Sequence, residues 1–173
     1  MALIIPQSNN FDWLGDGTRL VCPCCGCARP ATERFRHHFE LLQALRKWWD
    51  TSITLTSGYR CPAYNKKLGG AAKSQHILRR VPHDQNDDFA TDLVARIDST
   101  RIPPKRSKTK ADTYERWFMG HIQLAERAIE IGFTGVGVYR GDFIKEITPS
   151  IHLDLRPGEL ATWGSREAEA LSE

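Results

Sequence analysis

Residues 52–68 read SITLTSGYRCPAYNKKL and hold two elements with a sharp join between them. Ser52 to Thr56 alternates in polarity and is rich in β-branched residues, which predicts a strand that ends at Ser57-Gly58. Cys61 to Leu68 predicts a short helix, with Pro62 in the first turn where its missing N–H does no harm. A strand that passes directly into a short helix indicates a fold of mixed α and β structure.

Two longer helices are predicted on either side of this pair. From Ala31 to Asp50, apolar residues recur at spacings of three and four, and Thr32 is a suitable N-cap. Tyr114 to Ile131 repeats the amphipathic pattern.

Three further strands are predicted at Phe89 to Ile97, Gly135 to Tyr139 and Ile151 to Leu155. The order helix, strand, short helix, strand, helix, strand, strand is typical of an α+β domain. We therefore expect an antiparallel sheet with the helices on one side.

The 173 residues predict a single domain with an N-terminal arm at 1–30, a core at 31–163 and a tail at 164–173. The net charge of +3 would suit an anionic partner, either a cell-wall polymer or a nucleic acid, although an ordinary solvated surface is the simpler interpretation. Residues 101–110, RIPPKRSKTK, form a basic excursion that could clamp such a polymer, but no interleaved aromatic residues support nucleic-acid binding.

The start of the chain predicts a protein made in the cytoplasm without a signal peptide. It has no basic region, and its apolar run, Ala2 to Ile5, is too short for a signal sequence. No stretch approaches the roughly 18 apolar residues that span a bilayer. Action outside the membrane would require delivery by another component.

Four of the five cysteines crowd into residues 22–27, CPCCGC. These four thiols are too close in sequence to surround one tetrahedral ion. A knuckle formed by Cys22 and Cys25, or by Cys24 and Cys27, would therefore need partners from elsewhere, such as His37, His38 or Cys61. A tight turn with reduced thiols is the simpler interpretation.

Three segments carry candidate metal ligands: Ser74-Gln-His76, Ala90-Thr-Asp92-Leu93 and Ile151-His152-Leu-Asp154. A catalytic zinc ion takes three protein ligands and keeps one position open. Two imidazoles and one carboxylate would leave a net positive site that can activate water near neutral pH. Taken alone, two histidines and an aspartate are weak support for a metal site.

The residues around these ligands closely resemble the signature of the M15 zinc peptidases of bacterial cell-wall metabolism. The shared residues are Ser57-Gly-Tyr-Arg60, Pro62, Asn65, Gly69-Gly-Ala71, Ser74-x-His76, Ala90-x-Asp92-Leu93, His152-x-Asp154 and a trailing Trp163. The resemblance runs from about Ser52 to Trp163, and the upstream cysteine-rich turn is similar to that of phage-encoded members.

This resemblance implies a hedgehog/DD-peptidase-like fold with His76, Asp92 and His152 as zinc ligands. It also implies that Arg60 faces the substrate and stabilises a developing oxyanion, and that Ser74 binds near the metal or the substrate. Asp154 is expected to contact a metal-binding residue without binding the metal itself, and so to hold the site together.

The spacing departs from the family pattern between the first two ligands. Asp92 lies sixteen positions after His76, where relatives have about seven, so a loop containing His83, Asp87 and Asp88 is inserted beside the site. The Ala-x-Asp-Leu context favours Asp92 over Asp87 or Asp88, and His83 is a rival ligand.

The general base is the least defined role. Relatives carry an acidic residue shortly before the last histidine, but the position three before His152 is Pro149. Glu146 is slightly favoured as the base, because its spacing from His152 resembles that in the related hedgehog zinc fold. Asp142, as the family aspartate moved upstream by an insertion, is the alternative, and either carboxylate would have to reach the attacking water.

The expected function is zinc-dependent hydrolysis of a peptidoglycan peptide bond, as a D-Ala-D-Ala carboxypeptidase or an L,D-endopeptidase. Such an enzyme would reach the cell wall as a phage lysin after release, or as a virion-borne hydrolase associated with tail proteins. The alternative is a catalytically inactive module of the same fold in which zinc only stabilises a binding or virion structural protein.

Overall fold

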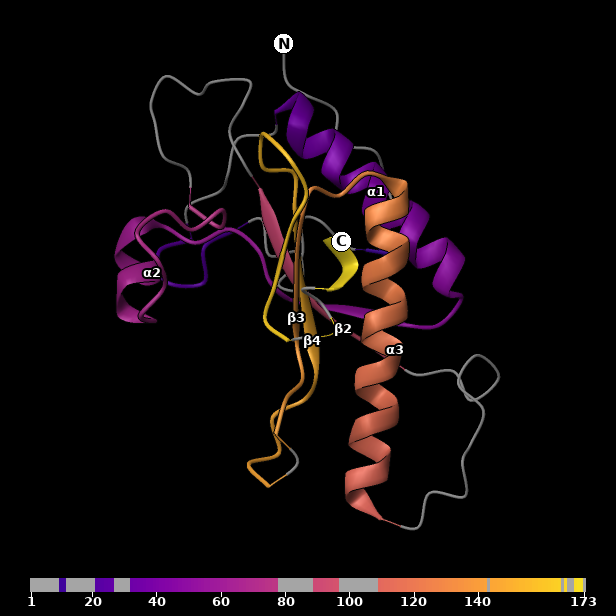
Figure 1. The fold of residues 1–173 in the computed structure, drawn as a ribbon. Coiled ribbons are helices and arrows are strands. Elements are labelled where there is room, and N and C mark those ends of the chain that lie inside the picture. Colours follow the sequence, from indigo (N-terminus) through magenta and orange to yellow (C-terminus); the bar gives the residue numbers. More distant parts are fainter. Residues whose placement is uncertain are drawn as a thin grey trace.

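The computed structural model describes residues 10–11, 21–26, 32–77, 89–96, 109–142, 144–165, 167 and 170–172. Its centre is a five-stranded sheet with the strand order β1-β2-β4-β3-β5 (Figure 1). The strands are β1 (Ile53–Ser57), β2 (Ala90–Ala95), β3 (Gly135–Tyr139), β4 (Ser150–Asp154) and β5 (Ala161–Trp163). The helices are α1 (Glu33–Trp49), α2 (Pro62–Lys67), α3 (Lys110–Ile131) and the short 3-10 turn η1 (Ala170–Ser172).

Caps in the sequence set where the long helices begin. The Thr32 side chain accepts a hydrogen bond from the Phe35 amide at 3.2 Å, as expected for the N-cap of α1. Helix α3 begins four residues before the predicted Tyr114, because Thr109 and Asp112 form a reciprocal capping box that adds another turn.

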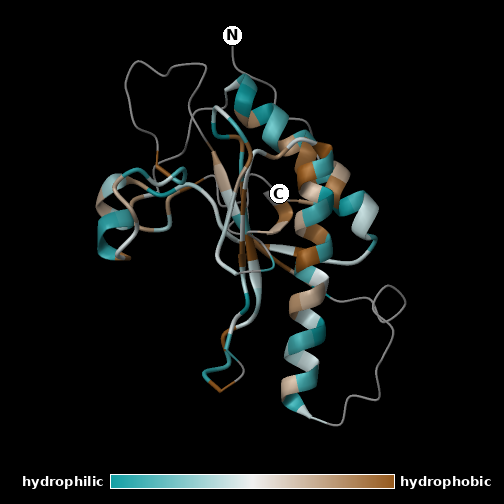
Figure 2. Ribbon diagram, in the orientation of Figure 1, coloured by the Kyte–Doolittle hydropathy of each residue, from teal (hydrophilic) through white to brown (hydrophobic). Residues whose placement is uncertain are grey.

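The two faces of the sheet are covered by different helices. Alternate residues of the strands, such as Leu93, Ile151 and Val138, are buried and pair side by side across β2, β4 and β3. Helices α1 and α3 lie together on one side of the sheet, and α2 lies on the other (Figure 1). In Figure 2 the half of α3 beside the sheet is rich in hydrophobic residues and its N-terminal half is largely hydrophilic, so the core lies between α1, α3 and the sheet.

The predicted α+β class is confirmed, with one refinement of the sheet. The pairs β1–β2, β2–β4 and β3–β4 are antiparallel, but β5, which was not predicted as a strand, runs parallel to β3. The inserted loop at 78–88 and most of the basic excursion, 101–108, lie outside the described residues. No helix in the described part of the chain has both the length and the apolar character needed to cross a membrane.

A buried histidine joins α3 to the end of β2. His121 is fully buried, its Nδ1 donates to the Trp117 carbonyl at 2.8 Å, and its Nε2 accepts from the Ala95 amide at 3.1 Å. Burial lowers the pKa of His121 to about 4, although the bond to Trp117 opposes this shift. A proton on Nε2 would also face the Ala95 N–H donor, so the folded protein holds this histidine neutral.

Replacing His121 with glutamine, which can both donate and accept but does not titrate here, should make the fold less sensitive to acid. An ordinary histidine pKa of about 6.5 in the unfolded chain, lowered on folding, means that the unfolded state binds the extra proton as the pH falls below that value. The native protein should therefore lose about 2 kcal/mol through His121 between pH 7 and pH 5. Denaturant unfolding of both proteins at the two pH values measures this loss, and an equal loss in the variant would contradict the assignment.

Candidate metal centre

One row of paired residues crosses all five strands. Ser57 of β1 pairs with Asp92 of β2, and Asp92 pairs with His152 of β4. His152 pairs with Gly137 of β3, and Gly137 pairs with Trp163 of β5. Directly paired residues point to the same face of a sheet, so the register alone brings Asp92 and His152 together.

His76 reaches this row from the segment that follows α2. The loop after α2 folds back because the Asn65 side chain donates to the Ala71 carbonyl at 3.0 Å, and a Cβ on Gly70 would collide with that side chain. The Arg60 amide then donates to the His76 carbonyl at 2.9 Å. These contacts hold His76 over the sheet, where its ring meets that of His152 edge to face.

The donor atoms of the three residues converge. His76 Nε2 lies 3.2 Å from His152 Nδ1 and 3.3 Å from Asp92 Oδ2, and His152 Nδ1 lies 2.8 Å from Asp92 Oδ1. Two ligands bound at about 2.0–2.1 Å to one tetrahedral ion lie about 3.3 Å apart. The spacing of the three side chains therefore fits a single small divalent cation.

Contacts behind the rings orient the two imidazoles. His76 Nδ1 donates to the Gly58 carbonyl at 2.7 Å, and His152 Nε2 donates to Asp154 Oδ2 at 3.0 Å. When the outer nitrogens carry these protons, the inner nitrogens present lone pairs toward each other and toward Asp92. Such an arrangement favours a cation between them. Asp154 thus lies next to His152, and its supporting role for a bound metal stays a prediction.

The charges of the site reinforce this arrangement. Burial raises the pKa of Asp92, but the contacts with His152 and His76 outweigh it and hold that pKa well below its usual range. Burial likewise raises the pKa of Asp154, but Arg156 and His152 lower it more strongly. Both carboxylates are therefore ionised, and Asp154 is fully buried between His152 and the Arg156 guanidinium.

Arg60 and Ser57 lie next to Asp92 at the β1 end of this row of paired residues. The Arg60 guanidinium donates to Asp92 Oδ2 at 3.0 Å and to the Ser57 hydroxyl at 2.7 Å. A bulge between Leu55 and Ser57 shifts the register at this point of β1. Ser74, also predicted near the site, accepts from the His76 amide at 3.3 Å and lines the same cleft.

Trp163 lies beside His152, at the β5 end of the row of paired residues. Its ring is 5.2 Å from that of His152, and its indole N–H donates to the Tyr139 hydroxyl at 3.0 Å. A Cβ on Gly137 would lie 2.6 Å from the Trp163 ring, so this glycine leaves the space that the indole occupies. The Arg156 guanidinium stacks 4.3 Å from the same ring, completing a wall beside His152.

Arg156 and Tyr139 were missed in the sequence. The strands at 135–139 and 151–155 were predicted, but the signal in them for which residues face the candidate ligands was not used. The alternation Gly135-x-Gly137 next to His152-x-Asp154 was such a signal, because a Cβ on Gly135 would overlap the Asp154 carboxylate.

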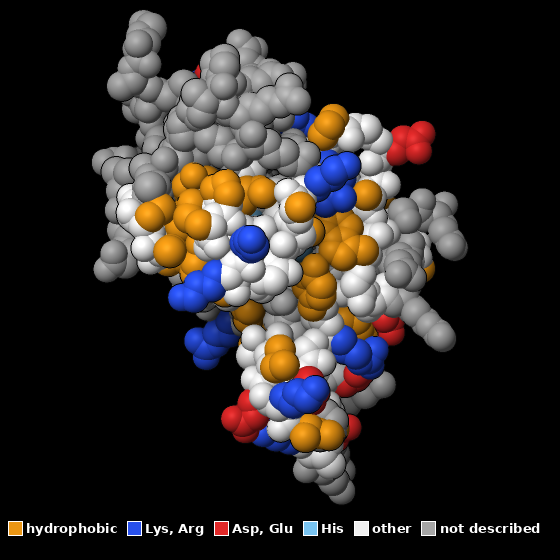
Figure 3. Space-filling model, turned by 90° about the vertical axis from the view of Figure 1, so that its left-hand side faces the viewer, with side chains coloured by type: hydrophobic (Ala, Val, Ile, Leu, Met, Phe, Trp, Pro, Cys, Tyr) orange, Lys and Arg blue, Asp and Glu red, His pale blue; other side chains and the backbone are white. Residues whose placement is uncertain are grey.

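The ligands open into a cleft of about 520 Å³. Besides the three ligands, its lining includes Arg60, Lys73 and Arg156, and Asp92 is the sole acidic residue among the described residues that form it. The face of the molecule that carries α2 shows Lys and Arg side chains around its middle, whereas Asp and Glu gather mainly at its lower end (Figure 3). The cleft therefore suits a ligand with negative charge.

The two predicted bases lie elsewhere in this conformation. Glu146 is exposed at a positive φ of 58° and forms an ion pair with Lys110 at 2.7 Å. Asp142 accepts hydrogen bonds from the amides of Ile144 and Lys145 in its own turn. Neither is among the described residues that line the cleft, so the assignment of a base stays a prediction.

The remaining candidate ligands have other places. His38 is buried, with its Nε2 3.0 Å from the Thr91 hydroxyl, and His37 lies on the exposed side of α1 near Glu40. His83 lies outside the described residues.

The comparison with protein families yields one match. The family described as Peptidase M15 matches residues 19–99, a span that includes Arg60, His76 and Asp92. Searches of curated proteins and of solved structures gave no significant match. The match covers a little under half of the chain, so over this span the chain is similar to M15 peptidases, and the convergence of His76, Asp92 and His152 agrees with that similarity.

Proposed function

We propose that the protein is a zinc-dependent peptidase that hydrolyses peptide bonds of peptidoglycan. The observation that carries this proposal is the convergence of two imidazole nitrogens and one carboxylate in an open, positively lined cleft. The similarity of residues 19–99 to a peptidase family supports hydrolysis of an amide bond.

Zinc is the metal that this donor set favours. Two neutral imidazoles and one carboxylate are typical ligands of catalytic zinc, with a further position left for water or substrate. When bound, the metal would lower the pKa of water and polarise the scissile carbonyl. His76, Asp92 and His152 would hold it, and Gly58 and Asp154 would keep both rings in the required tautomer.

Arg60 is the group best placed to meet the substrate carbonyl. It lines the cleft beside Asp92, and its guanidinium is held by Ser57 from one side. A permanently charged, rigid fork of donors suits an oxygen that gains negative charge during bond cleavage. Ser57 therefore acts as a positioning residue for Arg60.

The charge of the cleft supports an acidic peptide as the substrate. The stem peptides of peptidoglycan carry free carboxylates, and Lys73 and Arg156 provide cations in the lining of the cleft. Both a carboxypeptidase, which binds a terminal carboxylate, and an endopeptidase, which binds an acidic side chain, fit this lining. We propose a phage lysin or a virion-associated wall hydrolase as the biological setting.

A second candidate function is a zinc-stabilised binding or virion structural module without turnover. The observation in its favour is that Glu146 and Asp142 both hold partners outside the cleft. A protein of this kind would retain the metal and bind wall peptides without cleaving them.

Peptidoglycan digestion separates the two functions. Purified protein incubated with peptidoglycan of several crosslink types should release new amino termini or free D-alanine, with the products identified by mass spectrometry. A chelator should abolish release and added zinc should restore it. Metal binding without release from any wall type would contradict the enzyme and favour the binding module.

Replacing Asp154 with asparagine should weaken zinc binding about 10- to 100-fold, because the neutral amide supports His152 less well than the buried carboxylate does. Competition with a chromogenic chelator measures the affinity. Asp142→Asn is the matched control, since Asp142 bonds to its own turn, and it should leave the affinity unchanged. Equal affinities in all three proteins would contradict the role of Asp154.

The variants Glu146→Gln and Asp142→Asn also test the predicted base. Because both carboxylates have partners outside the cleft, we expect each variant to bind zinc normally and to keep peptide release within about a factor of two. Loss of release by a factor of about 100 or more, with zinc content intact, would instead assign that residue as the base.

A further inference from the structure

Three cysteines from two distant segments meet beside the Arg60 segment. The sulfurs of Cys22, Cys25 and Cys61 all lie within 4.8 Å of one another, and no disulfide joins them. Cys22 is fully buried, Cys61 is partly buried and Cys25 is exposed. The cleft and its predicted role do not use any of the three.

The turn at 22–26 has the geometry of a metal-binding knuckle. The Gly26 amide donates to the Cys22 carbonyl at 2.9 Å, and Gly26 has a φ of +66°, a conformation that glycine adopts easily. Two intervening residues then place the Cys22 and Cys25 sulfurs on the same side of the turn, as in the Cys-x-x-Cys halves of structural zinc sites. Cys24 points outward and does not join the group.

Backbone amides point at two of the sulfurs. The Cys61 N–H donates to Cys22 Sγ at 3.3 Å, and the Tyr64 N–H donates to Cys61 Sγ at 3.4 Å. Burial raises the pKa of the Cys22 thiol, but the backbone N–H groups of Cys61, Cys24 and Cys25 outweigh it and lower that pKa to about 7. The Tyr64 amide lowers the pKa of Cys61, but burial and the neighbouring Cys22 and Cys25 outweigh it, so that pKa is raised instead. The amides that surround Cys22 thus favour its thiolate, the form that metals bind.

We propose that Cys22, Cys25 and Cys61 hold a second, structural zinc ion. Sulfurs bound at about 2.3 Å to one tetrahedral ion lie about 3.8 Å apart, which the present separations allow with small rotations of the side chains. The described cysteines supply three of the four positions, and water or a further donor of the chain completes the set. This site is separate from the one that would perform hydrolysis.

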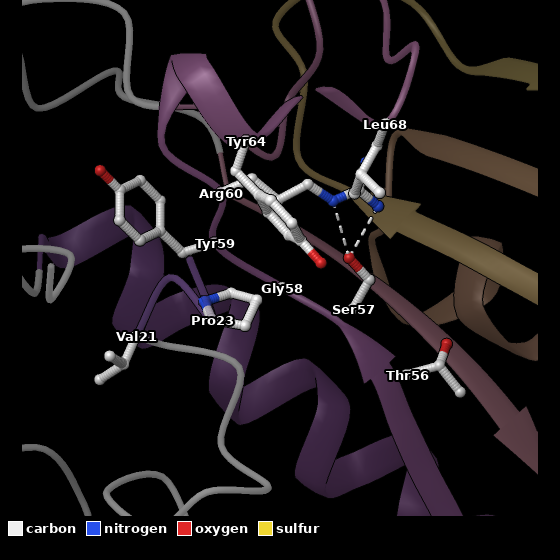
Figure 4. A pocket seen from close by; sticks show the side chains of 9 residues that line it. All are labelled: Val21, Pro23, Thr56, Ser57, Gly58, Tyr59, Arg60, Tyr64 and Leu68. Carbon is white, nitrogen blue, oxygen red and sulfur yellow. Dashed lines mark hydrogen bonds between the residues drawn. The ribbon is translucent and has the colours of Figure 1, made fainter. Parts of the chain in front are cut away.

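The ion would tie the N-terminal arm to the segment that carries Arg60. Cys61 follows Arg60 directly, and a pocket of about 220 Å³ lies between the cysteine turn and this segment. Figure 4 shows Val21 and Pro23 of the turn below Tyr64 and Arg60, with the Arg60 guanidinium bonded to Ser57. Fixing the turn therefore fixes one wall around the base of Arg60.

Cobalt substitution distinguishes the two sites. Cobalt(II) bound by thiolates gives an intense sulfur-to-metal charge-transfer band in the near ultraviolet, and cobalt bound by His76, Asp92 and His152 does not. The proteins to compare are the native chain, Cys25→Ser, Cys61→Ser, the control Cys24→Ser and His152→Ala, all purified under reducing conditions. Serine at position 61 keeps an oxygen that can accept from the Tyr64 amide, so the start of α2 is preserved.

The native protein and Cys24→Ser should bind about two zinc ions per chain and show the charge-transfer band. His152→Ala should keep the band and lose about half of the metal, whereas Cys25→Ser and Cys61→Ser should lose the band and about half of the metal. Absence of the band in both the native protein and His152→Ala would overturn the proposal, as would a Cys22–Cys61 disulfide in place of metal. The His152→Ala result holds even if a cysteine variant fails to fold.

Discussion

The pairing of Asp92 with His152 is the constraint on which the site depends. It is set by the register of β2 against β4, and that register is fixed in turn by the hydrophobic face formed by Leu93, Ile151 and their neighbours under α1 and α3. A slip of one residue in either strand would turn the candidate ligand of that strand into the core and expose its apolar residues. The same burial that stabilises the sheet therefore places the ligands in the cleft.

Each element next to this pair contributes a residue to the site or makes room for one. The loop after α2 brings His76, and the bulge in β1 brings Ser57 to the guanidinium of Arg60. On the other side, the glycines of β3 make room for Asp154 and for Trp163, whose strand runs parallel to β3. The ligand geometry consequently depends on long-range pairing, whereas Arg60 depends on a short local segment that the cysteine turn contacts.

The fold class, the seven predicted helices and strands and the grouping of His76, Asp92 and His152 could be predicted because they leave local signals. These signals are alternation in 53–57, helical spacing in α1 and α3, and the motif around His76 that resembles a known family. The parallel strand β5 could not be predicted, since three residues carry too little pattern. The partners of Asp154 and Trp163 depend on which strands are neighbours, and the sequence does not show this directly. Glu146 was predicted as the base from its spacing to His152. In the structure the Glu146 side chain forms an ion pair with Lys110, and the spacing in sequence does not reveal this contact.

The most direct test of the account is an anomalous-diffraction crystal structure of the zinc-loaded protein measured at the zinc absorption edge. A peak is expected about 2.0–2.1 Å from His76 Nε2 and His152 Nδ1 and about 2.0–2.2 Å from an Asp92 oxygen, with the Gly58 and Asp154 contacts retained. The absence of a peak between these three side chains, or binding through the outer nitrogen of either ring, would contradict it.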